Sequence, residues 1–123
     1  MQKALCVSGT HGKTTTSTML AHLLTQSGVA TDAFLGGISV NYNTNLLLKK
    51  DSDYVVIEAD EYDRSFHNLT PNMAVVTSTD ADHLDIYTSA EEYLESFSKF
   101  TSLITENGLL LMKKGLTFKP DVK

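Results

Sequence analysis

A glycine-containing segment, G-T-H-G-K-T-T-T at residues 9–16, stands between two stretches of different periodicity. Before it, residues 4–8 form a short apolar run, which is typical of a buried strand. After it, apolar residues recur at helical spacing over residues 14–27, and Gly28 stands where a helix commonly ends. This order of strand, glycine turn and helix constrains the chain to an α/β unit with a tight loop at its centre.

The residue types in this segment favour binding of a phosphate. Backbone N–H groups at a helix start attract anions, and Lys13 adds a full positive charge. The Thr14 hydroxyl follows the lysine, at the position that ligates Mg²⁺ in phosphate loops. The spacing is the short G-x-x-G-K-T form, because Val7 stands where the longer form has its first glycine. A glycine turn with a solvated lysine is the alternative. We predict that the following residues bind the phosphates of a nucleotide: Gly9, Thr10, His11, Gly12, Lys13, Thr14 and Thr15.

Further apolar runs predict four more strands, at residues 29–35, 54–59, 73–78 and 109–112. Ser89 and Glu92 have the spacing of a capping box, and the helix that follows carries its aromatic residues on one face. The Asn-rich stretch through residue 50 is predicted to be mostly loop. Because the strands are apolar throughout, the fold class is α/β, a mostly parallel sheet with flanking helices. Ligands of such sheets bind beyond the carboxyl ends of the strands.

Acidic residues and a histidine follow two of these strands. Glu58 ends one strand, and a carboxylate opposite a phosphate loop is a suitable oxygen ligand for Mg²⁺. Three more acids, Asp60, Glu61 and Asp63, could assist, but such a run is also typical of a solvated loop. His83 lies in D-A-D-H-L-D after the next strand, where it could be a metal ligand, a general base or an inert surface residue.

Composition excludes several classes of protein. The 123 residues allow one domain, and a net charge of −5 disfavours binding of a nucleic-acid backbone. No apolar run exceeds four residues, which excludes a membrane-spanning helix or a signal-peptide core. The one cysteine, Cys6, has no partner for an internal disulfide, so we expect a cytoplasmic protein.

Taken together, the motifs resemble the central ATP-binding domain of the Mur ligase family. The matching segments are G-T-H-G-K-T-T, E-A-D-E-Y-D-R-S-F at residues 58–66, L-T-P at 69–71 and D-A-D-H-L-D-I-Y at 80–87. The resemblance implies a fold like that of P-loop nucleotide hydrolases. It also implies that residues 1–123 form part of that central domain. The domains that hold the UDP-sugar and the amino acid would lie outside them.

The resemblance is strongest to the alanine-adding branch, which joins L-alanine to UDP-N-acetylmuramate in peptidoglycan synthesis. It implies that ATP phosphorylates the sugar carboxylate and that the amino group of L-alanine attacks the acyl phosphate. Lys13 would hold the β- and γ-phosphates, Thr14 and Glu58 would bind Mg²⁺, and His83 would bind a second Mg²⁺. By this resemblance Lys13, Glu58 and His83 are the catalytic residues.

Two alternatives stay open, a murein-peptide recycling ligase of the same family and a small P-loop phosphotransferase. A metal-dependent hydrolase or a pure binding module fits less well. Neither Lys99, which is off register with the carbamylated lysine of other branches, nor Asn45 is assigned a role. We expect these 123 residues alone not to catalyse ligation, and to bind nucleotide weakly if they bind it.

Overall fold

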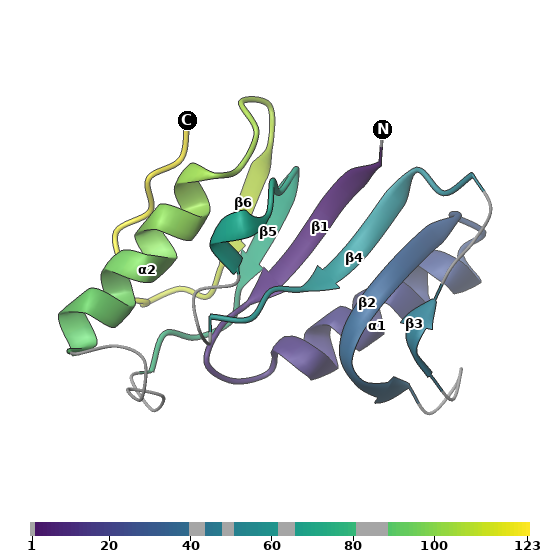
Figure 1. Cartoon of the computed structure of the whole chain (residues 1–123), viewed down its shortest axis with the longest axis horizontal. Coiled ribbons are helices and arrows are strands. Elements are labelled where there is room, and N and C mark those ends of the chain that lie inside the picture. The colour runs from purple at the N-terminus through teal and green to yellow at the C-terminus, as the bar shows by residue number, and fades with distance from the viewer. Residues whose placement is uncertain (1, 40–43, 48–50, 62–65, 81–88) are drawn as a thin grey trace.

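A computed structural model of the chain describes residues 2–39, 44–47, 51–61, 66–80 and 89–123. Within these ranges it contains six strands and two helices (Figure 1). In chain order they are β1 (Lys3–Ser8), α1 (Lys13–Gln26), β2 (Thr31–Ser39), β3 (Thr44–Leu47), β4 (Tyr54–Glu58), β5 (Met73–Val76), α2 (Ala90–Ser102) and β6 (Leu109–Met112).

The strands form one sheet in the order β3-β2-β4-β1-β5-β6. All neighbouring strands pair in parallel except β2 and β3, which pair antiparallel. The first strand, β1, therefore lies between β4 and β5, with Leu5 opposite both Val56 and Met73. The segments that follow β1, β4 and β5 emerge next to one another at the carboxyl edge of the sheet, where α/β proteins bind ligands. The three motifs found in the sequence, at residues 9–16, 58–66 and 80–87, lie at or after the ends of these three strands.

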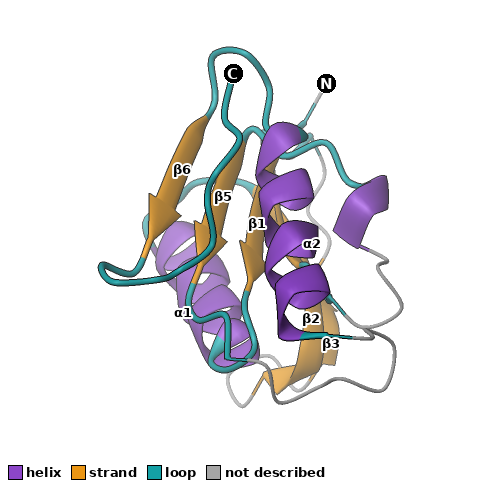
Figure 2. Cartoon of the chain, turned by 90° about the vertical axis from the view of Figure 1, so that its left-hand side faces the viewer, coloured by secondary structure: helices purple, strands orange, loops and turns teal. Residues whose placement is uncertain are grey.

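The helix α2 covers one face of the sheet and α1 the other (Figure 2). On the α2 side, Tyr93, Phe97, Phe100 and Ile104 are fully buried, as the sequence predicts. Phe66, from a single helical turn at 66–68, packs on this row with ring centroids 4.9 Å from Phe100 and 5.6 Å from Phe97. The predicted start of this helix is confirmed, because the Glu92 backbone N–H donates to Ser89 Oγ at 3.1 Å. Among the described residues, the hydrophobic cluster on this face contains five buried aromatic rings, those of Phe66, Tyr93, Phe97, Phe100 and Phe118.

The helix α1 packs on the part of the sheet formed by β1, β2 and β4. It buries Ser17 and Ala21 and leaves Met19 and Leu23 59% and 60% exposed. Leu20 and Leu24 are partly buried and pack against the cluster formed by Leu5, Ala21, Ala33, Leu35 and Val56, so these leucines and the small buried residues make the contact with the sheet. Beyond the reach of α1, Leu109 and Leu111 of β6 are 50% and 54% exposed on the same face.

The five predicted parallel strands and both helices are confirmed, and so is the α/β class. The expectation of mostly loop through residue 50 is wrong in part. The strand β2 continues through Gly36 and Gly37 to Ser39, and β3 pairs with it, with Phe34 opposite Leu46. The register shifts between Phe34 and Ser39, and such an irregularity accommodates glycine within a strand. Among the described residues, no helix is both long and apolar enough to cross a membrane.

Candidate functional site

The loop after β1 is fastened to the end of β5. Thr10 N–H donates to the Ser78 carbonyl at 3.0 Å, and His11 N–H donates to Ser78 Oγ at 2.9 Å. Gly9 has a φ of 137°, and a Cβ at this position would lie 2.1 Å from Thr77 Oγ1. Only glycine fits this combination of backbone conformation and close approach, which explains the first glycine of the motif.

Gly12 caps the start of α1 in the left-handed conformation, with a φ of 85°. It provides no side chain to accept from the first-turn N–H groups, and the first turn contains no acidic residue. Those N–H groups have no carbonyl partner within the helix, and the helix dipole adds positive potential there. Thr14 and Thr15 are exposed in the same turn. This end of α1 therefore has the geometry of an anion site.

Thr14 and Glu58 lie together at this end of α1. The Thr14 hydroxyl donates to Glu58 Oε1 at 2.6 Å, across 44 residues of sequence. Glu58 is the last residue of β4, whose neighbour in the sheet is β1. Two of the three expected metal ligands are thus within hydrogen-bond distance of each other, and both offer oxygen, which Mg²⁺ prefers.

Lys13 lies beside the buried carboxylate of Glu61, which belongs to a run of acids that is typical of a solvated loop. Its Nζ is 3.5 Å from Glu61 Oε2, and the Glu61 side chain is only 2% exposed. Tyr93 of α2 donates to Glu61 Oε1 at 3.3 Å, and its hydroxyl lies 2.8 Å from Thr10 Oγ1. A solvated loop is therefore the wrong description of Glu61. No signal near position 61 could have shown this, because its partners come from the phosphate loop and from α2.

The third motif begins next to the loop. Thr10 Oγ1 donates to the Asp80 carbonyl at 2.7 Å, and His11 Nε2 is 3.9 Å from Asp80 Oδ2. His83 lies outside the described residues, so its predicted role stays a prediction. His11 makes its backbone contacts to the end of β5 while its ring is exposed, in keeping with a residue that shapes the loop.

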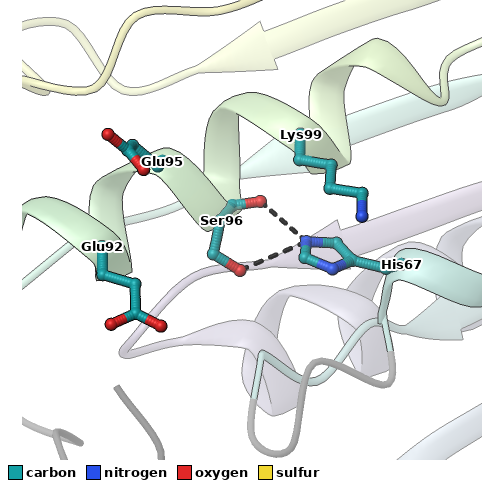
Figure 3. Close-up of a pocket in the computed structure, with 5 residues that line it drawn as sticks. All are labelled: His67, Glu92, Glu95, Ser96 and Lys99. Carbon is teal, nitrogen blue, oxygen red and sulfur yellow. Dashed lines mark hydrogen bonds between the residues drawn. The ribbon is translucent and has the colours of Figure 1, made fainter. Parts of the chain in front are cut away.

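A separate pocket of about 360 Å³ lies along α2, and none of the phosphate-loop residues lines it. Figure 3 shows five described residues that line it: His67, Glu92, Glu95, Ser96 and Lys99. The His67 ring binds the Ser96 carbonyl at 3.0 Å and Ser96 Oγ at 3.2 Å. This contact ties the helical turn at 66–68 to α2, so His67 has a structural partner. Lys99 points toward the same ring.

The residues present fit a magnesium–nucleotide ligand. The glycine turn and the uncapped start of α1 suit phosphate, and the Thr14–Glu58 pair supplies neighbouring oxygens. In the part of the chain that the structure describes, no group of three or more His, Cys, Asp or Glu side chains could hold a metal ion. A cation here would therefore complete its shell with phosphate oxygens and water, as Mg²⁺ commonly does.

Comparison with known proteins agrees with this geometry. The family model of the Mur ligase middle domain matches residues 7–117. The chain belongs to the Mur ligase family. It is 65% identical over 118 residues to the UDP-N-acetylmuramate–L-alanine ligase of Phocaeicola vulgatus. That match covers 96% of this chain and 26% of the relative, so the chain spans about a quarter of the curated ligase.

Solved Mur ligases share the fold. The UDP-N-acetylmuramate–alanine ligase of Thermotoga maritima superposes with a TM-score of 0.80 at 30% identity, covering 94% of this chain and 26% of that one. The UDP-N-acetylmuramate:L-alanyl-gamma-D-glutamyl-meso-diaminopimelate ligase of Neisseria meningitides gives a TM-score of 0.85 at 30% identity. It covers 94% of this chain and 40% of that one. The family and fold expected from the motifs are confirmed.

Proposed function

We propose that this chain is part of the ATP-binding domain of a ligase that joins L-alanine to UDP-N-acetylmuramate. Residues 1–123 provide the phosphate loop and metal ligands, and the binding sites for the sugar and for the amino acid come from other parts of the enzyme. The observation that carries the proposal is the contact of Thr14 with Glu58 beside Lys13 at the start of α1. The 65% identity to a ligase of that name favours L-alanine as the amino acid.

Each residue has a defined task in this reaction. Backbone N–H groups at the start of α1 bind the phosphates, and Lys13 neutralises charge on the β- and γ-phosphates. Thr14 and Glu58 hold Mg²⁺, which when bound screens the charge of the transferred phosphoryl group. His83 is assigned a second Mg²⁺ by the family resemblance. Positioning of the substrates and stabilisation of charge account for most of the rate acceleration, since phosphoryl transfer requires little covalent chemistry from the protein.

The decisive experiment measures phosphate release from ATP by the full-length enzyme. We expect release to require both UDP-N-acetylmuramate and L-alanine. A P-loop phosphotransferase would release ADP when a hydroxyl acceptor is present, and this release would not depend on the amino acid. Phosphate release that does not depend on L-alanine would refute the assignment to an L-alanine-adding ligase. Lys13→Ala should abolish turnover under either reaction, so it serves only as a negative control.

A second arm separates the two ligases of the family. The relative from Neisseria meningitides is named for a reaction with the peptide L-alanyl-gamma-D-glutamyl-meso-diaminopimelate. We expect the present enzyme to use L-alanine and not this peptide. Preference for the peptide would assign the chain to the recycling ligase instead.

The reaction consumes ATP, and Cys6 is a buried free thiol, so we place the enzyme in the cytoplasm. We expect the 123 residues alone to show no ligation. Alanine-dependent ADP release from this chain by itself would contradict that expectation.

A further inference from the structure

Two carboxylates of one short segment face two successive residues of the phosphate loop. Glu58 accepts a hydrogen bond from Thr14, while Glu61, three residues later, pairs with Lys13. The side chains of Lys13 and Glu61 are 17% and 2% exposed, so water screens this ion pair poorly. The end of β4 and the segment that follows it therefore contact the Thr14 hydroxyl and the Lys13 ammonium with different acids.

Glu61 is itself held in place from α2. Tyr93 is fully buried and donates to Glu61 Oε1 at 3.3 Å, and its hydroxyl is 2.8 Å from Thr10 Oγ1. Thr10 in turn donates to the Asp80 carbonyl at 2.7 Å. A buried carboxylate is stable only when charges and hydrogen bonds compensate its lost hydration. Lys13 and Tyr93 both provide such compensation, one at each carboxylate oxygen.

The geometry points to Glu61 and Tyr93 as positioning residues that orient Lys13 for the nucleotide phosphates. The inference rests on the proposed function, since it assumes that Lys13 binds ATP. A lysine ammonium sits on a flexible stem of four carbons, and fixing it in advance lowers the entropy cost of binding. The ammonium carries three donors, so an ion pair with Glu61 leaves donors for phosphate oxygens.

A role for Glu61 as a metal ligand is disfavoured by its surroundings. Its Oε2 already faces an ammonium 3.5 Å away, and a second cation there would be repelled by the first. The carboxylate that contacts the predicted metal-binding hydroxyl is Glu58. The two acids therefore have separate tasks, Glu58 for the metal and Glu61 for the lysine.

The test compares Glu61→Gln and Tyr93→Phe in the full-length ligase. Both substitutions preserve size, and each has a matched control: Glu91→Gln removes an exposed acid on α2, and Tyr54→Phe removes a hydroxyl at the start of β4. We expect Glu61→Gln to raise KM for MgATP about tenfold, because the Lys13 ammonium loses the ion pair that fixes its position. KM for UDP-N-acetylmuramate and for L-alanine should stay within about twofold of wild type, because Glu61 contacts the phosphate loop through Lys13. A smaller folded fraction would lower the maximum rate and change no KM, so a rise in KM for MgATP alone reports on the nucleotide site.

A double variant tests whether Tyr93 acts through Glu61. If it does, Glu61→Gln with Tyr93→Phe raises KM for MgATP no more than Glu61→Gln alone, whereas independent effects would multiply. If the two increases in KM for MgATP multiply, Tyr93 does not act through Glu61, and its positioning role is refuted. Unfolding midpoints of all variants are measured alongside, so that a KM effect is separated from a loss of stability.

A spectroscopic measurement keeps the proposal testable if a variant is too unstable for kinetics. The Lys13 ammonium should give a slowly exchanging ¹H–¹⁵N signal in the wild type and in Glu91→Gln, and lose it in Glu61→Gln. An unchanged signal, or an unchanged KM for MgATP in an active enzyme, would overturn the positioning role. A wild-type enzyme without alanine-dependent phosphate release would instead overturn the proposed function, so the two failures are distinct.

Discussion

Replacing Gly9 by alanine tests how tightly the phosphate loop is fastened to the sheet. The structure places a Cβ at this position 2.1 Å from Thr77 Oγ1 and 2.9 Å from the Ser78 nitrogen. The hydroxyl of Thr77 can rotate away, but the Ser78 backbone belongs to the segment that binds Thr10. An alanine at position 9 also has to adopt a φ of 137°, which side-chain-bearing residues rarely do.

The cost has two parts. Backbone strain in the positive-φ region contributes about 1–2 kcal/mol, and forcing a methyl group into a filled space contributes about 1–3 kcal/mol. We therefore expect Gly9→Ala to lower the free energy of unfolding by about 2–5 kcal/mol. Small domains have a total stability of about 5–15 kcal/mol, so the variant should remain folded only under mild conditions.

Urea unfolding monitored by circular dichroism measures this loss. Gly28→Ala is the matched control, because Gly28 has a φ of 85° but no atom within 4 Å of its Cβ position. The free energy of unfolding of the control variant should fall only by the backbone contribution, about 1–2 kcal/mol. If both variants lose the same stability, the close approach of Gly9 to β5 does not constrain the loop and the reasoning fails.

Three further predictions concern the core, a helix cap and the thiol. Phe97→Ala removes a fully buried ring that packs on Phe66, Tyr93 and Phe118, and should cost about 3–5 kcal/mol in urea unfolding; a loss below about 1 kcal/mol would contradict the packing. Ser89→Ala removes the acceptor of the Glu92 N–H and should cost about 1 kcal/mol, whereas no change would mean that the cap is not formed. Burial raises the pKa of the Cys6 thiol from 9.0 to about 12, so Ellman's reagent at about pH 8 should label it only after unfolding. Because the unfolded thiol ionises at lower pH than the folded one, stability should fall as pH rises from 9.0 toward 12, and Cys6→Ala should lack that part of the fall.

Local patterns were enough to predict most of the fold. Continuous apolar runs indicated five parallel strands, and Ser89 with Glu92 indicated the start of α2. The strand β3 was missed because Gly36 and Gly37 usually end a strand, and here β2 passes through them with a shift of register. Helical spacing placed Met19 and Leu23 with the apolar residues of α1, but it could not tell which of them reach the sheet. That choice depends on how closely the helix packs.

The candidate site was predictable where its chemistry is local. The loop glycines, Lys13 and Thr14 are neighbours in sequence, and Glu58 was found because it ends an apolar strand. Glu61 was not distinguishable from Asp60 by residue type. The two acids differ only through the fold, since Asp60 is exposed while Glu61 is enclosed by Lys13 and Tyr93.

The anchoring of the phosphate loop has a consequence for the order in which the molecule assembles. The loop itself occupies seven early positions, but the side chains and carbonyls that hold it, from Thr77 to Tyr93, lie 66 to 83 residues further along the chain. During synthesis on the ribosome, β1 and α1 therefore emerge well before anything that can fix the turn between them. We expect the nucleotide pocket to form as a late, cooperative step of folding, and a nascent chain halted before β5 to contain residues 9–16 without a working site.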